Sequence, residues 1–389
     1  MSSIEVRVEK MAAGGDAIAR MADGRVAFVR GALPGEQVAI RVVQSKKDFV
    51  RAEVVDVLDP APYRVVPPCP KHHAGCGGCT WQHVDADAQL QLKTSVVTEA
   101  LRRTGKIVDP VVEIGASVSP WAYRTTLRLA TGVDRLGLRS RHSHDVVELD
   151  LCLVSHPLLE DLLARVHVRG DGEVSLRVSA ATGERSAFVV EGDVELIDIP
   201  SDVAVGATAQ IREAVSGTTF QISAASFFQS GPQAAELLVA AVRDATGELV
   251  GAPTTVDAYG GVGLFAATVG GPTVTVVEAS ASACTDAVVN LADRKAHILC
   301  TQVEHWKPRR ADLVIADPSR SGLGKHAAAV LTATEAPRIV LVSCDPVSLA
   351  RDAGLLRELG YDHIRSTVLD LFPQTHHVEV VTRFDRRST

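Results

Sequence analysis

The chain has 389 residues, 46% of them hydrophobic and 22% charged, and it carries a formal net charge of −7. This length and composition predict a globular protein of two or three domains, each able to bury its own core. The acidic balance argues against indiscriminate binding to nucleic acid, but it leaves room for a local basic surface.

No targeting segment is visible in the sequence. The first ten residues are polar and charged, unlike a secretory signal. The longest uncharged run, residues 258–277, contains five glycines and Pro272, so it predicts a turn, a short helix and a strand rather than a membrane span. We therefore expect a cytoplasmic protein with no membrane partner, and a monomer as the default state.

The first domain, residues 1–62, is predicted to be a small antiparallel β-barrel. Apolar or alternating runs occur at 26–29, 37–43 and 51–58. Turn sequences separate the runs: Gly14-Gly15, Asp23-Gly24, Pro34-Gly35 and Lys46-Lys47-Asp48. Small barrels of this kind often bind oligonucleotides, but the fold alone does not define a function.

A proline-rich boundary then leads into a cysteine cluster with the spacing Cys69-x6-Cys76-x2-Cys79. The loop is rich in glycine, which lets several thiolates face one ion or cluster, so it predicts a zinc or iron–sulfur site. Seven cysteines without a secretory signal favour metal binding or catalysis over disulfides. Cys152 is the remaining candidate for a fourth ligand, with a buried strand cysteine as the alternative. Zinc remains an alternative because three histidines lie nearby in the sequence and can also bind it: His72, His73 and His83.

The central domain, residues 63–215, is predicted to be mostly β after one helix at 85–103. Charge is uneven in this domain. Residues 101–144 hold eight Arg or Lys against three acids, a net +5, whereas residues 145–215 are acidic. The basic segment is either a site for a polyanion or an ordinary solvated face, and the sequence gives both interpretations equal weight.

The last domain, residues 216–389, alternates apolar runs with helical patterns. Strand candidates begin near five positions: Thr254, Thr273, Ile298, Leu313 and Ile339. This alternation predicts a doubly wound α/β fold. Because chemistry in such folds lies at the carboxyl ends of the strands, the residues that follow these runs are candidates for the site.

A glycine-rich turn, residues 257–263 (DAYGGVG), follows the first of these strands. Glycines let a backbone approach a bound ligand closely. Glu278 ends the next strand, 21 residues after Asp257, where a carboxylate can accept hydrogen bonds from ribose hydroxyls. The spacing is not G-x-G-x-x-G, which favours S-adenosylmethionine over NAD. A plain strand–helix turn is the remaining alternative.

Cys344 follows the apolar run 338–342 and precedes a helical pattern at 347–359. A helix N-terminus lowers the pKa of a thiol and favours a nucleophilic thiolate. The alternative is an inert buried cysteine, which is the expectation for Cys284 and Cys300.

Two acids stand at comparable places. Asp317 follows the run 311–316, where it can position a polar heterocycle or simply cap a helix. Glu379 lies in the β-like segment 375–381, where an acid is costly unless it is paired or used, so it is a candidate general base. His376 and His377 are expected on opposite faces of this strand, which disfavours a shared metal.

Together these motifs resemble the RNA uracil-5-methyltransferase family, which includes enzymes of 23S rRNA and tRNA. Residues 343–346 (SCDP) resemble its nucleophile motif, 377–379 (HVE) its base motif and 317–320 (DPSR) its uracil-side motif. Residues 227–229 (FFQ) resemble the segment that opens its methyltransferase domain. The resemblance covers essentially the whole chain.

The resemblance implies a TRAM-like, OB-like barrel and a central domain that hold RNA, and a C-terminal Rossmann-like class I methyltransferase domain. It implies that Cys344 is the nucleophile, Glu379 the base and Asp317 the residue that orients uracil. Contacts to S-adenosylmethionine are implied for Gln229, Asp257, Tyr259, Gly261, Gly263, Glu278 and Asp317. A [4Fe-4S] cluster is implied on Cys69, Cys76, Cys79 and Cys152.

The chain departs from the family pattern in two places. Ser319 follows Pro318 where the family often has a second proline, and six residues rather than five separate the first two cluster cysteines. The barrel and cluster resemble the rRNA members, so 23S rRNA is the favoured target and tRNA the alternative.

Two rival functions differ in class. An RNA cytosine-5-methyltransferase would carry a cysteine after an Asp-x-Pro motif, and residues 317–320 carry none. A non-catalytic RNA-binding iron–sulfur protein would not need the cofactor turn, Cys344 and Glu379 together.

Overall fold

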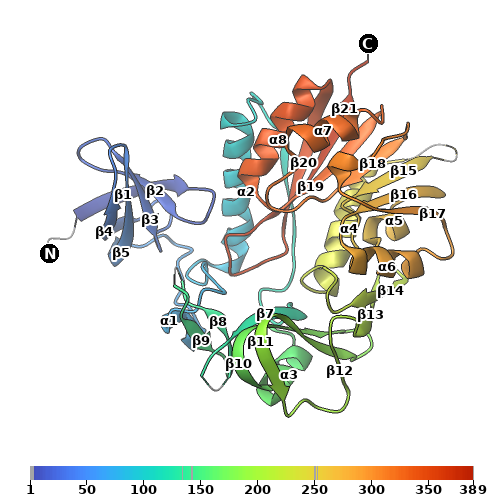
Figure 1. Cartoon of the computed structure of the whole chain (residues 1–389). Coiled ribbons are helices and arrows are strands. Elements are labelled where there is room, and N and C mark those ends of the chain that lie inside the picture. Colours follow the sequence, from blue (N-terminus) through green and yellow to red (C-terminus); the bar gives the residue numbers. More distant parts are fainter. Residues whose placement is uncertain (1–3, 134, 142, 249–250, 252, 389) are drawn as a thin grey trace.

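The computed structural model describes residues 4–388, apart from 134, 142, 249–250 and 252. Residues 134 and 142 belong to the basic segment 101–144 and lie outside this description. Figure 1 shows a small barrel near the N-terminus, a central β region and a larger α/β region that holds the C-terminus. Across the described residues, each helix is too short or too polar to cross a membrane.

The N-terminal strands form a closed barrel, as predicted, and their order is β1-β2-β3-β5-β4. The barrel is not antiparallel throughout, because β3 and β5 pair in parallel. The strands are β1 (Ile4–Met11), β2 (Ala17–Arg20), β3 (Val26–Arg30), β4 (Gln37–Ser45) and β5 (Phe49–Asp59). Alternate residues of β3 are buried, so small and branched side chains fill the interior.

The central region is built on a six-stranded sheet in the order β12-β11-β10-β7-β8-β9. Its strands are β7 (Thr126–Thr131), β8 (Leu136–Arg139), β9 (Val146–Glu148), β10 (His167–Val178), β11 (Arg185–Ile197) and β12 (Val203–Val205). The helices of this part of the chain are α1 (Pro70–His73), α2 (Ala86–Arg103) and α3 (Pro157–Arg165). A hairpin of β13 (Gln210–Val215) and β14 (Thr218–Ser223) leads into the last region.

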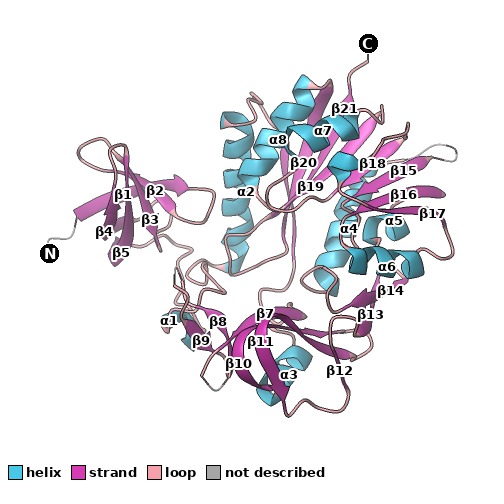
Figure 2. Ribbon diagram, viewed as in Figure 1, coloured by secondary structure: helices cyan, strands magenta, loops and turns pink. Residues whose placement is uncertain are grey.

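The α/β region contains an eight-stranded sheet in the order β17-β16-β15-β18-β19-β21-β20-β6 (Figure 2). The strands are β6 (Val112–Ser117), β15 (Thr254–Ala258), β16 (Thr273–Glu278), β17 (Lys295–Cys300), β18 (Leu313–Ala316), β19 (Arg338–Ser343), β20 (Tyr361–Asp370) and β21 (Glu379–Arg386). The helices are α4 (Pro232–Thr246), α5 (Leu264–Thr268), α6 (Ala281–Asn290), the 3-10 helix η1 (Val303–His305), α7 (Gly324–Thr332) and α8 (Pro346–Glu358). The predicted doubly wound fold is confirmed.

Each face of this sheet packs on its own core. In β18, Leu313 and Ile315 pack with α4, α5 and α6, whereas Val314 and Ala316 pack with α2, α7 and α8. This alternation follows from the two-residue period of a strand, and a strand buried on both faces needs the continuous apolar run seen in the sequence.

Segment boundaries differ from expectation in two places. β6 lies within the predicted central domain but pairs in parallel with β20, and α2 packs on α8, so residues 86–117 contribute to the α/β region. β21 begins only at Glu379, so His376 and His377 lie in the turn before it. The division into domains 1–62, 63–215 and 216–389 stays a prediction.

A buried ion pair joins α2 to the segment before β21. The Nζ of Lys93 lies 2.6 Å from Oδ1 of Asp370, and both side chains are almost fully buried. Burial alone lowers the pKa of Lys93 and raises that of Asp370, and each charge opposes the shift of the other. Gln89 of α2 adds reciprocal hydrogen bonds with Gln374. These contacts fix the segment between β20 and β21 against α2.

We expect Lys93→Ala to lower the free energy of unfolding by about 3–5 kcal/mol, because it leaves the Asp370 carboxylate buried without its partner. Lys10→Ala is a matched control, because Lys10 pairs at 2.6 Å with Glu99 of the same helix but at the surface. Its expected cost is about 1 kcal/mol or less. Urea unfolding measures the free energy of unfolding of both variants. An equal loss in the two would contradict the expected penalty for leaving the Asp370 carboxylate buried without its partner.

Candidate active site

Strand register brings the three predicted catalytic residues to one edge of the sheet. β15, β18 and β19 are parallel neighbours, so Asp317 and Cys344 leave the sheet at the same edge. Ser343 pairs with Val380 in the antiparallel contact of β19 with β21, which places Cys344 opposite Glu379. Strand order reverses beside β15, and the carboxyl edge at such a point is where open α/β sheets bind ligands.

The carboxylates at this edge are held in an environment that disfavours charge. Glu379 is 4% exposed, and its Oε1 has no hydrogen-bond partner among the described residues. Burial raises the pKa of Glu379 well above its ordinary value, and the neighbouring Asp317 raises it further. Burial also raises the pKa of Asp317. A carboxylate with a raised pKa is a good proton acceptor when it is ionised.

The expected lowering of the Cys344 pKa is wrong. Burial of the half-buried thiol raises its pKa to about 12, and Glu379 and Asp317 add to this, while Arg320 opposes it. The start of α8 does not offset these effects, because Asp345 already occupies it as the N-cap and accepts hydrogen bonds from the backbone N–H groups of Val347 and Ser348. A nucleophilic role for Cys344 therefore requires the thiol to lose its proton as it attacks.

The glycine-rich turn after β15 is built around two carboxylates. Oδ2 of Asp257 accepts a hydrogen bond from the backbone N–H of Ala266 at 2.8 Å, while its Oδ1 is buried with no partner among the described residues. Burial raises the pKa of Asp257 to about 7. Glu278 accepts a hydrogen bond from the backbone N–H of Gly261 at 2.9 Å. A side chain at Gly261 would meet open space, so the turn leaves room for a ligand on that side.

Two other turn residues have left-handed backbone angles. Tyr259 has φ +59° and a buried hydroxyl with no partner among the described residues. Gly263 has φ +90° and precedes α5, where a Cβ would lie 3.1 Å from Leu291. These features give the turn a fixed shape and leave polar groups available to a bound molecule.

Gln229 is buried in the segment between β14 and α4. Arg177, a residue that sequence reasoning missed, holds this segment by donating to the backbone oxygens of Ser223 and Ser226. Asp286 of α6 accepts from the hydroxyls of the same two serines. No motif marks Arg177 or Asp286 in the sequence, because the groups that each hydrogen-bonds lie far away in the chain.

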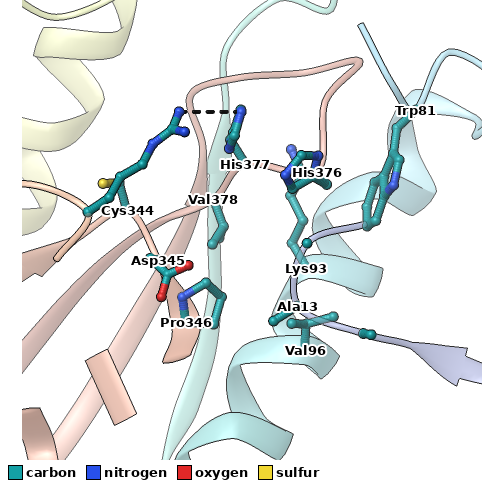
Figure 3. A pocket seen from close by; sticks show the side chains of 13 residues that line it. Ala13, Trp81, Lys93, Val96, Cys344, Asp345, Pro346, His376, His377 and Val378 are labelled. Carbon is teal, nitrogen blue, oxygen red and sulfur yellow. Dashed lines mark hydrogen bonds between the residues drawn. The ribbon is translucent and has the colours of Figure 1, made fainter. Parts of the chain in front are cut away.

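A cavity opens in front of Cys344 (Figure 3). Arg320, Cys344 and Asp345 line one side, and Trp81 and Lys93 line the other. The barrel closes the rim with its β1–β2 turn: Ala12, Ala13 and Gly14. The candidate nucleophile therefore faces a pocket that three parts of the chain build together.

His376 and His377 stand between Cys344 and Trp81 in Figure 3. Their ring centroids are 4.3 Å apart, so they do not point to opposite faces of a strand as expected. Nε2 of His377 lies 3.4 Å from a guanidinium nitrogen of Arg320, and Nδ1 of His376 lies 3.1 Å from Oγ1 of Thr80. The turn, not a strand, sets their geometry.

The four predicted cluster ligands line a second cavity with an otherwise largely apolar wall: Cys69, Cys76, Cys79 and Cys152. Arg141 supports their loop by donating to the backbone oxygens of Cys76 and Cys79. Within the described part of the chain, no three His, Cys, Asp or Glu side chains are grouped to hold a metal ion as they stand. Cys300, in contrast to expectation, is exposed, while Cys284 is buried.

Internal contacts engage part of the basic segment 101–144. Arg128 and Arg139 both pair with Glu173 of β10, which belongs to the acidic stretch that follows. Arg141 supports the cysteine loop. These three arginines therefore have partners within the protein. A role of the segment in holding RNA stays a prediction.

The glycine-rich turn, the order of the eight-stranded sheet and the residues at its carboxyl edge are those of a class I methyltransferase that uses S-adenosylmethionine. A protein-family model described as TRAM domain matches residues 2–55. A second family model, described as tRNA (Uracil-5-)-methyltransferase, matches residues 273–387. A protein of Streptomyces avermitilis described as an uncharacterized RNA methyltransferase is 34% identical, over 97% of this chain and 96% of the relative. Another of Gloeobacter violaceus is 32% identical, over 99% and 96%.

The crystal structure of Pyrococcus abyssi tRNA (uracil-54, C5)-methyltransferase, in complex with S-adenosyl-L-homocysteine, superposes with a TM-score of 0.73. The match covers 98% of this chain and 100% of that one at 23% identity, which shows a common fold. The chain belongs to the RNA uracil-5-methyltransferase family, and it is an S-adenosylmethionine-dependent RNA methyltransferase.

The raised carboxyl pKa predicts a pH-dependent effect of Glu379→Gln on stability. The stabilisation due to a protonated Glu379 is present below its ordinary pKa of 4.5 and is lost as pH rises through the raised one. Gln cannot ionise, so we expect the Tm of the variant minus that of the wild type to be larger at about pH 8 than at about pH 5. Thermal unfolding monitored by circular dichroism measures this, and an equal difference at both pH values would contradict the raised pKa.

Proposed function

We propose that this enzyme methylates carbon 5 of a specific uridine in RNA, with 23S rRNA as the first candidate, through a covalent adduct between Cys344 and uracil. The observation that carries the proposal is the register that sets Cys344 opposite Glu379 beside Asp317, at the carboxyl edge of the sheet. A thiol and an unpartnered buried carboxylate in one place fit a reaction that needs a nucleophile and then a base.

Carbon 5 of uracil is a poor nucleophile, so it must first be activated. The Cys344 sulfur adds to carbon 6 as a thiolate, which makes carbon 5 enolate-like. Because the pKa of the free thiol is raised to about 12, its proton must leave as the bond to carbon 6 forms, and it passes to solvent through the pocket in front of Cys344, so that Glu379 stays ionised for the later step. Asp317 orients the ring by accepting a hydrogen bond from its polar edge.

Bound S-adenosylmethionine supplies the methyl group that carbon 5 takes. The residues proposed to hold it are Gln229, Asp257, Tyr259, Gly261, Gly263, Glu278 and Asp317. The unpartnered oxygens of Asp257 and Tyr259 and the open space at Gly261 support this assignment. Glu379 then removes the remaining carbon-5 proton, and the sulfur leaves carbon 6 to regenerate the thiol.

The target base must leave its stack to reach the pocket in front of Cys344. Extrusion costs a few kcal/mol and favours loops over intact helices. The barrel turn and Trp81 close that pocket on the side away from the nucleophile, so an entering base passes between the barrel and the catalytic edge.

A [4Fe-4S] cluster on Cys69, Cys76, Cys79 and Cys152 is part of the proposal. What supports it is that all four cysteines line one cavity. A tetrahedral zinc site, with the sulfurs about 2.3 Å from one ion, is the alternative that metal analysis tests. A cubane cluster is larger and takes one thiolate per iron. When bound, it serves as a structural element, because the proposed chemistry transfers no net electrons.

Replacing Cys344 with Ala should abolish methylation with little change in fold, and Glu379→Gln should accumulate a covalent RNA adduct because the carbon-5 proton stays in place. Cys300→Ala is the control, since Cys300 is exposed and outside the pocket. A deletion strain complemented with each variant allows 5-methyluridine to be mapped by mass spectrometry in 23S rRNA and in tRNA. The modified RNA identifies the target, and methylation retained by Cys344→Ala would refute the nucleophile.

Anaerobic purification should yield about four iron atoms and four acid-labile sulfides per chain. Cys152→Ser should lose most of the iron, and Cys284→Ser should keep it, because Cys284 is also a buried cysteine but lies in α6. Iron analysis and the visible absorption spectrum measure both. Stoichiometric zinc without iron would contradict the cluster.

A further inference from the structure

The barrel touches the catalytic region at one glycine. Gly15 lies in the turn between β1 and β2, with φ +92°. A Cβ at this position would lie 2.7 Å from Cβ and 2.9 Å from Cγ of His376. These separations are shorter than real Cβ contacts, so the Gly15 backbone packs directly on the His376 side chain and leaves no space for another residue.

Trp81 fixes this contact from the side. Its indole N–H donates to the backbone oxygen of Gly15 at 3.1 Å, and its backbone N–H donates to the oxygen of Gln374 at 2.9 Å. The Lys93 ammonium lies 5.9 Å from the centroid of its ring. Trp81 is 2% exposed. Its two hydrogen bonds link the barrel to the turn before β21.

From His376 the contacts continue to the nucleophile. The His376 ring lies against that of His377, and Nε2 of His377 lies 3.4 Å from the Arg320 guanidinium, which can donate to it. Burial lowers the pKa of His377 to about 3, so the ring is neutral and can accept this hydrogen bond. Arg320 is the cation whose charge acts on the Cys344 thiol. Figure 3 shows His376, His377 and Cys344 in this order across the pocket.

We propose that Gly15 and His376 form a joint through which the barrel positions His377 and Arg320 at the mouth of the Cys344 pocket. The barrel is then part of the active site and not only an RNA-binding arm. Gly15 and His376 are positioning residues in this proposal, because neither acts on the reacting atoms. The kinetic part of the inference rests on the proposed uridine methylation.

The chain offers a matched pair of glycines for the test. Gly24, in the turn between β2 and β3 of the same barrel, has φ +86°, but a Cβ there would meet nothing within 4 Å. Gly15→Ala and Gly24→Ala therefore impose the same kind of backbone strain, and only the first presses on His376. We expect a lower Tm for Gly15→Ala than for Gly24→Ala because of this clash, and unchanged affinity for S-adenosylmethionine in both.

In methylation assays with the identified RNA, we expect Gly15→Ala to lower kcat roughly tenfold to a hundredfold, the range for a small misplacement near reacting groups. The KM for RNA should change by less than about threefold, because phosphate contacts over a wide surface supply most of the binding. Gly24→Ala should keep the wild-type kcat. Equal kcat values for the two variants would overturn the joint.

Double variants test the contact itself. In a His376→Gly background the side chain that Gly15→Ala would strike is gone, so adding Gly15→Ala should cause no further loss of kcat. If Gly15→Ala causes the same fold-loss in both backgrounds, its effect does not pass through His376 and the proposal is wrong.

A readout that needs no RNA separates this proposal from the proposed function. The rate of Cys344 alkylation by iodoacetamide, followed by peptide mass spectrometry, should rise in Gly15→Ala, because a side chain there pushes the turn and His376 apart and opens the pocket. Gly24→Ala should match the wild type. A wild type that methylates no uridine refutes the proposed function alone, whereas unchanged alkylation in Gly15→Ala refutes the joint alone.

Discussion

The antiparallel pairing of β21 with β19 is the constraint on which the candidate site depends. Parallel strands alone bring Asp317 and Cys344 to one edge, but a base must come from a strand that starts where they end. A shift of β21 by one residue would turn Glu379 to the other face of the sheet, because side chains alternate along a strand. The apolar residues that follow Glu379 hold this register, since Val380 and Val381 are buried in the cores on opposite faces of the sheet.

Burial raises the pKa of Glu379, Asp317 and Cys344, and neighbouring carboxylates add to the shift for Glu379 and Cys344. In the proposed reaction, a base with a raised pKa binds the carbon-5 proton well. The raised pKa of the thiol instead opposes formation and departure of the thiolate, so its proton must move as the bond to carbon 6 forms and breaks.

Much of this arrangement could be predicted from the sequence, because its signals are local. Strand ends, a glycine-rich turn and a buried acid in an apolar run identify Cys344, Asp257 and Glu379 as candidates without any tertiary contact. The turn at His376 could not be predicted in the same way, because Gly15 and Thr80, about 360 and 300 residues upstream, contact it. The sheet that β6 joins could not be predicted for a related reason. An alternating run indicates a strand but not the strand with which it pairs. The raised thiol pKa could not be predicted, because sequence shows the helix start but neither the burial of the sulfur nor the two carboxylates beside it.

The contacts around Trp81 change how the domain organisation relates to function. An RNA-binding barrel on a free linker would raise the local concentration of substrate, and its orientation would not matter to the chemistry. Here the barrel core continues into Trp81 and one face of α2, and the barrel turn lines the pocket that faces the nucleophile. Orientation then matters, because a base that enters the pocket contacts the barrel and the catalytic edge at once. If the proposed uridine methylation and the proposed role of the Gly15–His376 contact both hold, recognition of the RNA and alignment of the reacting groups share one contact, and selection of the correct uridine acts on the rate of the reaction as well as on binding.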